Sequence, residues 1–335
     1  MSRTTQALIT LTATLAIVVF IQPFSAVAHR TQASVGKSAK ALLWSEPTDL
    51  ASRKLLYGPG GQEHAPSGTF TFIEEDHGGY NPKFTVRDQQ GRKWKVKLGP
   101  EAKSETAATR LVWAAGYFAD EDYFVPELRV EQMKKLSRGE EFVSPDGTVR
   151  GARLELHKAD EKKIGDWSWF ENPFIGSREL NGLKVMMALI NNWDLKTENN
   201  AVYEGPDGTR RYVVSDLGAS FGRTGSISTR SRSNLQDYVR SEFIEKIRPA
   251  EVDFVLDTRP FFLLAINFPW YNERSEMEKI VKHIPRSDAR WIGTLLAGLS
   301  NEQLSDAFRA AGYTQQEAEL YTQQLRYRIT QLTKL

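Results

Sequence analysis

Apolar and polar residues alternate along the first half of the chain in short runs that end at turn residues. The stretches GTFTFIEED, KFTVRD and KWKVKL alternate with a period of two, which is typical of strands with one buried face. Gly78, Gly79 and Pro82 lie between the first two stretches, and QQGR separates the second from the third. Two further strands are predicted in YFVPELRVEQMKKL and VRGARLELHK, on either side of an SPDG turn. The pattern predicts an antiparallel meander between about residues 66 and 156.

One helix interrupts these strands. In SETAATRLVWAAGYF the alanines, Leu111 and Trp113 recur at helical spacing, and Ser104 is the predicted N-cap. Beyond residue 160 the helical pattern dominates, beginning with an apolar helix from about Ser177 to Asn191. The segment AVYEGPDGTRRYVVSDLG predicts a hairpin with GPDG as its turn. Two capping-box patterns start helices near the end of the chain, Ser300 with Gln303 and Thr314 with Glu317.

The first 28 residues have the layout of a secretory signal peptide. A short segment with Arg3 precedes an uncharged apolar run, and Ala26-Val27-Ala28 provides a small-x-small cleavage pattern. An uncleaved membrane anchor is the alternative, because the apolar run approaches the roughly 20 residues that span a bilayer. In both cases the rest of the chain is expected to be exported, to the periplasm or the cell exterior. Residues 29–45 are polar and are predicted to form a tether.

Composition excludes several kinds of site. The formal net charge of the 335-residue chain is only +2, so no concentrated basic face is predicted and nucleic acid is not an expected partner. The chain has no cysteine, which excludes disulfides and thiolate metal sites. Its five histidines are scattered without a His-x-x-x-His pair, so zinc is not expected.

Two short motifs in the second half carry candidate chemistry. WDLKTEN follows the apolar helix, and VVSDLG ends the hairpin. Together with the lysine on the third predicted strand and the early glutamate of the helix, this order resembles the protein-kinase-like fold. The resemblance covers about residues 66 to 222. It implies an α+β, two-lobed fold, with an N-terminal lobe of antiparallel sheet plus one helix at residues 46–158 and a mainly helical C-terminal lobe at residues 159–335.

The resemblance also implies roles for four residues. Asp194 is the expected base that orients the acceptor hydroxyl, and Lys196 is expected to stabilise charge on the transferred phosphoryl group. Asn199 and Asp216 are the expected magnesium ligands, because Mg²⁺ prefers oxygen donors. ATP and Mg²⁺ are therefore the implied cofactors. The alternative interpretation is a charged loop at a helix end followed by an ordinary turn.

The nucleotide side of the expected site is drawn from the first lobe. Lys95 and Lys97 share one face of their strand, and Lys97 is expected to reach the phosphates with Glu105 as its partner; Glu101 is the alternative partner. Gly78 and Gly79 are expected to admit backbone close to phosphate. Three acidic residues just before them oppose this, Glu74, Glu75 and Asp76, so an ordinary hairpin turn is the other interpretation.

Departures from the usual kinase pattern point to an atypical branch. Asn192-Trp193 stands where His-Arg usually precedes the catalytic aspartate, Leu217 replaces the Phe of Asp-Phe-Gly, and no Ala-Pro-Glu follows. The chain therefore resembles phosphoinositide-kinase-like, bacterial toxin-kinase-like or secreted kinase-like proteins. The expected function is an exported Mg-ATP-dependent phosphotransferase with an unspecified acceptor: a protein, a lipid or a small molecule. The alternatives are a catalytically inactive kinase-fold binding or scaffold protein of the cell envelope, and a structural envelope protein.

Two other stretches stand out by composition. RTGSISTRSRS is rich in arginine and serine and is predicted to be a flexible loop, with self-modification or binding of a phosphorylated partner as the alternative. RPFFLLAINFPWYNERS is dense in apolar and aromatic residues. It is predicted to be a core helix that ends at a proline, with a lipid or partner surface as the alternative.

Overall fold

The computed structural model describes residues 40–223, 230–256 and 267–335. The predicted signal peptide (residues 1–28) and the first part of the predicted tether (residues 29–39) lie outside the described residues. Residues Ala39–Leu335 form one compact unit. None of the helices within the described ranges has the length and apolar character needed to cross a membrane.

The last part of the predicted tether belongs to the fold. Strand β1 (Ala41–Leu42) pairs in parallel with β9 (Arg210–Val214). Leu43 is buried, and the indole nitrogen of Trp44 donates a hydrogen bond to the carbonyl oxygen of Ala115. This segment therefore packs against the edge of β9 and the C-terminal end of α1. The tether prediction is wrong from residue 41 onward.

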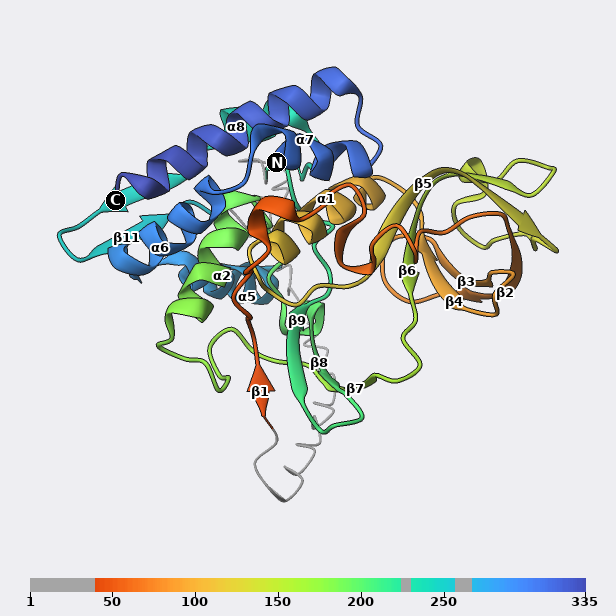
Figure 1. Ribbon diagram of the computed structural model, residues 1–335, viewed down its shortest axis with the longest axis horizontal. Helices are drawn as coiled ribbons and strands as arrows, with labels where there is room; N and C mark the ends of the chain where they lie inside the picture. Colours follow the sequence, from red (N-terminus) through yellow and green to blue (C-terminus); the bar gives the residue numbers. More distant parts are fainter. Residues whose placement is uncertain (1–39, 224–229, 257–266) are drawn as a thin grey trace, which may run out of the picture. The chain divides into compact units, whose positions relative to one another are not determined.

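Five strands close into a barrel in the order β2-β3-β4-β6-β5 (Figure 1). Neighbouring strands pair antiparallel, except that β2 and β5 pair in parallel and complete the ring. The predicted strands are therefore present, but the sheet is a closed barrel rather than an open meander. Alternate side chains such as Phe84, Val86, Trp94 and Val96 fill its interior. The strand bounds are β2 Thr69–Asp76, β3 Lys83–Arg87, β4 Lys93–Lys97, β5 Asp122–Glu131 and β6 Thr148–Leu156.

Helix α1 (Glu101–Ala114) connects the barrel to the helices of the second lobe. It begins earlier than predicted, with Pro100 at the N-cap, so Ser104 lies inside the helix instead of capping it. The tight turn at Gly99, with a φ of 93°, lets the chain pass from β4 into the helix through only three connecting residues, 98–100. The core of the helical lobe includes Ala107, Ala108, Leu111 and Ala114. The helix also packs against β5 and β6 of the barrel.

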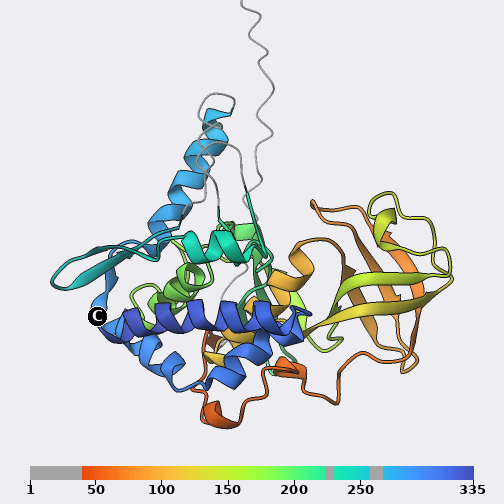
Figure 2. The same cartoon turned by 90° about the horizontal axis from the view of Figure 1, so that it is seen from above.

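The second lobe is mainly helical, as predicted. Figure 2 shows α8 running beside α6 and α7, and α8 packs on both. Ser177 caps α2, and the two predicted capping boxes are both formed. The helices are α2 Arg178–Leu189, α3 Leu235–Arg240, α5 Phe268–Glu278, α6 Arg286–Ala297, α7 Asn301–Ala310 and α8 Gln315–Thr333.

Two small sheets accompany these helices. The predicted GPDG hairpin is confirmed: it consists of β8 (Asn200–Glu204) and β9. Strand β7 (Lys162–Gly165) pairs with the other edge of β8. The second sheet has the order β10-β11-β12, with bounds Ile244–Ile247, Glu251–Phe254 and Ile284–Pro285. The first of these sheets matters for the site, since both candidate motifs flank its hairpin.

The aromatic stretch near residue 265 differs from its prediction. Residues 257–266 lie outside the described residues, and Pro269 stands in the first turn of α5 instead of ending a helix. Proline fits there because the first helical N–H groups need no partner within the helix. Phe268 is 62% exposed, so this end of α5 is not a core helix. The predicted RTGSISTRSRS loop falls largely on residues 224–229, which are also outside the described residues.

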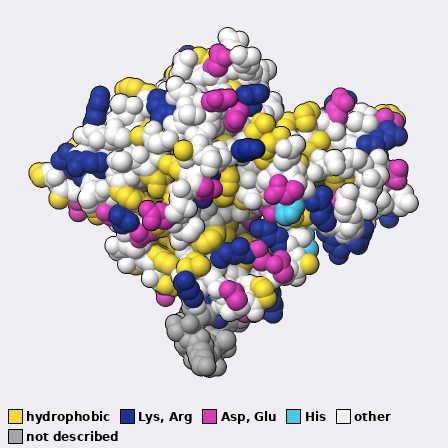
Figure 3. All heavy atoms as spheres, in the orientation of Figure 1, with side chains coloured by type: hydrophobic (Ala, Val, Ile, Leu, Met, Phe, Trp, Pro, Cys, Tyr) yellow, Lys and Arg dark blue, Asp and Glu magenta, His cyan; other side chains and the backbone are white. Residues whose placement is uncertain are grey.

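The described part of the chain buries two apolar clusters. One fills the barrel, and the other joins α1 with the helices of the second lobe. The fold is thus the expected α+β, two-lobed arrangement, with α1 shared between the lobes. On the face in Figure 3, basic and acidic side chains are interspersed over most of the surface.

Candidate active site

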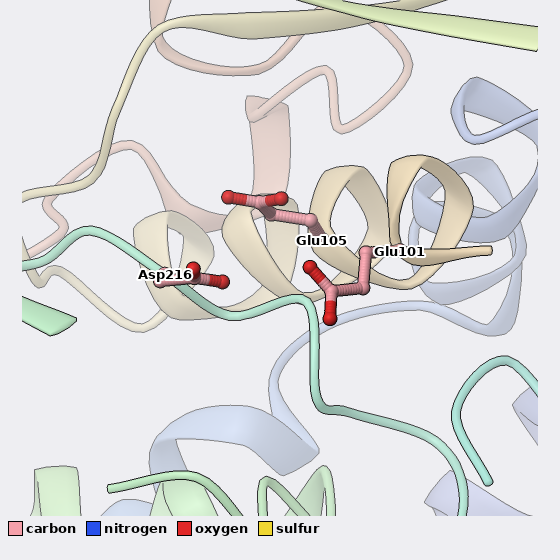
Figure 4. Close-up of side chains that lie close together, drawn as sticks. All are labelled: Glu101, Glu105 and Asp216. Atoms are coloured by element: carbon pink, nitrogen blue, oxygen red, sulfur yellow. The ribbon is translucent and has the colours of Figure 1, made fainter. Parts of the chain in front are cut away.

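Lys97 is the centre of the candidate site. It ends β4 and is buried, with its Nζ 2.7 Å from Glu105 Oε2 and 3.3 Å from both Glu101 Oε2 and Asp216 Oδ1. The two glutamates lie one turn apart on α1, and Asp216 follows β9. Figure 4 shows the three carboxyl groups turned toward the same space. The structure therefore brings together the predicted Lys97–Glu105 pair, its alternative Glu101 and the predicted metal ligand Asp216.

The charges of this cluster depend on one another. Burial opposes the positive charge of Lys97, but the surrounding carboxylates outweigh it and raise the pKa of the lysine. For Asp216, burial acts to raise the pKa, yet Lys97 and the N–H of Gly218 lower it overall. Both groups are therefore held ionised. A permanently charged lysine flanked by carboxylates is suited to bind a polyanion while a metal ion takes up the acidic charge.

Sequence reasoning missed Arg153 on β6. Its register places it opposite Lys97, where Nη2 lies 3.3 Å from Glu105 Oε1 and Nε lies 2.8 Å from Asp122 Oδ2. Glu105 thus binds a cation with each of its carboxylate oxygens. In the sequence Arg153 belongs to an alternating strand and looks like a solvent-facing charge. One sequence signal could have identified Arg153. If the charged strands β4 and β6 are paired, Arg153 lies opposite Lys97.

A hydrogen bond between α1 and the loop after β9 positions Asp216. Ser104 Oγ donates to the carbonyl oxygen of Gly218 at 2.6 Å, and the Gly218 N–H donates to Asp216 Oδ1 at 3.1 Å. A Cβ on residue 218 would lie 2.8 Å from the Glu101 side chain. Glycine is thus needed for close packing against α1, which keeps the Asp216 carboxylate beside Lys97.

The two candidate loops are joined through Asn199. Its side-chain Nδ2 donates to the backbone carbonyl oxygen of Asp194 at 2.6 Å. The backbone carbonyl oxygen of Asn199 accepts from the backbone N–H groups of Ser215 and Asp216. The β8–β9 hairpin brings these segments together, because Asn200 and Val214 form its last pair. Asp194, Asn199 and Asp216 therefore lie in one connected region, as the sequence predicted.

Asp194 itself is held by cations. Arg274 on α5 donates from Nη2 to Asp194 Oδ1 at 2.7 Å, and Lys196 Nζ lies 3.6 Å from the same oxygen. The backbone N–H of Asp194 donates to Asn192 Oδ1. Arg274 was not foreseen from the sequence, since it lies 80 residues from Asp194 in an aromatic helix. No sequence signal distinguishes it from other helix arginines.

The β2–β3 turn that contains Gly78 and Gly79, which we call the glycine hairpin, lies next to the charged group around Lys97. It lacks the usual three-glycine sequence of kinase loops. Gly79 has a φ of 66°, and the Gly78 N–H donates to Asp76 Oδ1. Asp76 also lies 4.0 Å from Lys95, so Lys95 is directed to this hairpin and not to the Lys97 cluster. Asn81 at the end of the turn donates to Glu101. The turn is thereby connected to the first turn of α1.

A polar cavity of about 290 Å³ lies where the barrel meets the β7-β8-β9 sheet. Lys95 and Glu155 line it from the barrel, and Tyr203 lines it from β8. Asp120 also faces it, with an inaccessible Oδ2 that lacks a hydrogen-bond partner and a pKa raised by burial and by the charge of Glu155. The cavity contains residues from both lobes and is large enough for a heterocyclic base.

Several oxygen atoms in the site are suited to hold a metal ion. One carboxylate oxygen from each of Glu101, Glu105 and Asp216 lies within 4.8 Å of the other two. Asn199 uses its amide nitrogen for Asp194, which leaves the amide oxygen as a donor. This donor set is composed only of oxygen, the preference of Mg²⁺ and Mn²⁺. It fits the ion that the sequence motifs imply.

Comparisons with known proteins give only remote similarities. The chain matches no family model and no curated protein. Among solved structures it is similar to the proinflammatory kinase CtkA of Helicobacter pylori, with 12% identity, a TM-score of 0.43, and coverage of 80% of this chain and 95% of that one. It is also similar to the Golgi casein kinase, with 11% identity, a TM-score of 0.36, and coverage of 81% and 72%. The structure of the Golgi casein kinase with Mn/ADP bound has 12% identity and a TM-score of 0.36, and the match covers 81% of this chain and 73% of that one.

The assignment of the fold comes from the arrangement of the chain itself. A small β lobe contributes Lys97, one helix contributes Glu105, and two loops around the β8–β9 hairpin contribute Asp194 and Asp216. Their order along the chain and their meeting point between the lobes agree with the resemblance seen in the sequence. The chain has a two-lobed, protein-kinase-like fold.

Proposed function

We propose that the protein is a phosphotransferase that uses ATP and a divalent metal ion, Mg²⁺ by preference. The observation that carries the proposal is the meeting of Lys97, Glu105 and Asp216 in one buried cluster, connected through Asn199 to Asp194. Phosphoryl transfer requires mainly positioning and charge stabilisation. A lysine fixed between carboxylates, next to oxygen donors for a metal, provides both.

Each residue of the site has a separate task in this proposal. Lys97 binds a phosphate oxygen, and Glu105 with Arg153 behind it keeps the lysine in place. Asp216 and Asn199 would hold the metal ion, with Glu101 close enough to contribute a further oxygen. The metal ion, when bound, would neutralise charge on the phosphates.

Asp194 is the proposed base. Its Oδ1 is bound to Arg274, which fixes the orientation of the carboxyl group, and Oδ2 is the oxygen that would receive the proton of the acceptor hydroxyl. Lys196 Nζ lies 3.6 Å from Asp194 Oδ1, and from this position it would stabilise charge on the transferred phosphoryl group. The proton of the acceptor hydroxyl would pass to Oδ2, and the hydroxyl oxygen would bond to the γ-phosphorus of ATP. The bond from that phosphorus to the β–γ bridging oxygen would break, with ADP as the leaving group.

The place of action is also a proposal. The N-terminal segment has the layout of a signal peptide, which supports export of the folded part. We infer that the protein acts in the periplasm or outside the cell, either free or attached through the N-terminal segment if it remains uncleaved. The polar cavity lined by Lys95, Glu155 and Tyr203 is where we place the nucleotide base.

The proposal is tested with Asp216→Ala in the purified full chain. We expect this variant to lose ATP turnover by a factor of about 10³, the usual scale for removal of an electrostatic catalytic group, while its unfolding curve stays cooperative. Asp146→Ala is the matched control, because Asp146 is an exposed aspartate on the distant β5–β6 connection. Equal turnover in the wild type and in Asp216→Ala would refute the site.

A catalytically inactive nucleotide-binding protein is the second candidate. The Arg274–Asp194 ion pair favours it, because Arg274 already occupies one oxygen of the carboxyl group that would have to face the acceptor. The hairpin also lacks the three-glycine pattern of kinases. Mg-ATP binding in a thermal-shift titration, without any turnover that Asp216→Ala removes, would favour this candidate over the first.

A further inference from the structure

Three arginines surround the indole ring of Trp193, directly before the proposed base. Arg230, Arg232 and Arg274 have their guanidinium carbons 5.5, 5.4 and 5.5 Å from the centre of that ring. We call this group the arginine cluster. It adjoins Lys196, so that four cations lie around the Asp194 end of the site. These four cations outnumber the two carboxylates that pair with them, Asp194 and Glu101.

Two of these arginines have assigned carboxylate partners. Arg274 binds Asp194, and Arg232 binds Glu101 on α1. Arg232 also lies over Tyr80 of the glycine hairpin, at 5.7 Å from the ring centre. Arg232 therefore connects the loop of Trp193 and Asp194 with α1 and the glycine hairpin, and Arg274 connects that loop with α5, so both have a role within the site already described.

Arg230 is different. Its guanidinium lies against Trp193 at 5.5 Å and Trp270 at 4.5 Å. Among the described residues it forms no ion pair, and its Nε and Nη2 have no hydrogen-bond acceptor. Burial and the neighbouring charge of Arg274 lower its pKa to about 10. A cation with covered faces and unmatched donors destabilises the protein unless an anion compensates it.

We propose that the arginine cluster, through Arg230, binds an anionic group of the acceptor, so that the acceptor is a hydroxyl compound that carries a carboxylate or a phosphate. The inference rests on the proposed function, because the cluster lies beside Asp194, where the acceptor hydroxyl has to arrive. An anion at Arg230 would place that hydroxyl within reach of the base. Guanidinium groups match carboxylate and phosphate geometry and bind them with paired hydrogen bonds.

The test measures binding, so it needs no turnover. Two fluorescein-labelled peptides of equal length carry a central serine flanked by glutamates or by glutamines, and anisotropy gives their affinities for the full chain with Mg-ATP present. Competition by glycerol 3-phosphate, with glycerol as its neutral counterpart, examines a small phosphorylated acceptor in the same assay. We expect at least one anionic ligand to bind about tenfold more tightly than its neutral counterpart, which corresponds to about 1.4 kcal/mol.

Arg230→Gln should remove most of this preference and leave the neutral ligands unaffected. Arg240→Gln is the matched control, because it removes one equal charge from the exposed end of α3. Arg230→Lys retains the charge and should retain part of the preference for anionic ligands. If Arg230→Gln is poorly folded, the affinity ratio of Arg230→Lys tests the inference instead. Equal affinities for anionic and neutral ligands, or an equal loss in Arg240→Gln, would overturn the inference.

The outcome separates this inference from the proposed function. Phosphoryl transfer to the acidic and the neutral peptide with the same efficiency would refute the anion site and leave the phosphotransferase intact. Selective binding of an anionic ligand that depends on Arg230, without any transfer, would retain the anion site and refute the phosphotransferase.

Discussion

Lys97 Nζ lies 2.7 Å from Glu105 Oε2, and the two residues are only 6% and 1% exposed. The pair joins the last residue of β4 to the second turn of α1. Because both charges are removed from water, Lys97 depends on Glu105 and Asp216 for compensation, and Glu105 depends on Lys97 and Arg153. The orientation of α1 relative to the barrel and the electrostatics of the candidate site are thus set by the same contact.

Removing one member of this pair should destabilise the protein strongly. We expect Lys97→Met to lower the free energy of unfolding by about 3 kcal/mol, because Asp216 loses its cation and Glu105 keeps only Arg153. Urea unfolding followed by circular dichroism measures this loss, and the Mg-ATP thermal shift should disappear in the same variant.

The matched control is Lys93→Met, which removes an exposed lysine from the same strand and should change stability by less than about 0.5 kcal/mol. The double variant Lys97→Met/Glu105→Gln should lose less stability than the two single variants together. Strict additivity would show that the two charges do not interact in solution.

Ser104→Ala should affect Asp216, the proposed metal ligand, although no hydrogen bond joins the Ser104 side chain to Asp216. The change removes the hydrogen bond from Ser104 Oγ to the Gly218 carbonyl and should lower stability by about 1 kcal/mol. Because the Gly218 loop carries Asp216, we expect a weaker dependence of the ATP thermal shift on Mg²⁺, with a midpoint about tenfold higher. Thr106→Val is the control, since Thr106 Oγ1 bonds only within α1, to the Ala102 carbonyl. An unchanged Mg²⁺ midpoint in Ser104→Ala would contradict the positioning role.

Arg328 should be one of the most sensitive residues outside the site. This buried arginine of α8 donates to the carbonyl oxygens of Leu189, Tyr238 and Ser241 and stacks on the Tyr238 ring at 4.2 Å. Arg328→Met should cost about 3 kcal/mol, because the buried carbonyls lose their donors. Gln323→Met, an exposed change on the same helix, should be near neutral in the same urea experiment. Similar stability of both variants would refute a structural role for this arginine.

Asp253 should give the protein an acid-dependent stability. Hydrogen bonding to Arg248 and to the His283 N–H lowers the pKa of Asp253 to about 2. A lowered folded-state pKa stabilises the protein above the ordinary aspartate pKa of about 3.9, and this contribution is lost as the pH falls toward 2. Asp253→Asn should therefore be less stable than the wild type at pH 6, by about 1.5 kcal/mol, and nearly equal to it at pH 2. A constant difference across that range would contradict the shift.

The sequence predicted much of the site because its residues belong to local patterns. Asp194 and Asn199 share one short loop, and Asp216 follows a strand that a GPDG turn pairs with the strand after Asn199. Period-two alternation identified β4, whose last residue is Lys97. Local patterns of this kind predict which helices and strands form. The order of these elements along the chain then indicates which residues of the two lobes lie close together.

Contacts between distant segments could not be predicted in the same way. Arg153 and Arg274 look like exposed charges in their own elements, yet each is buried against a partner that lies many residues away. The residue pattern favours Ser104 as the N-cap of α1, whereas the helix begins directly after Pro100, which stands at the N-cap. Ser104 has N-cap chemistry, but its hydroxyl bonds to the Gly218 loop instead.

The ring of strands in the barrel also bears on how the chain reaches its native state. Strand β2 is synthesised early but has one neighbour, β5, that follows only after α1, so closure requires a contact of high sequence separation and should be a slow step. Until then β2 offers unpaired backbone to other chains. Once β5 is in place, the ring has no free edge for strand exchange, and the finished lobe is protected from edge-to-edge aggregation.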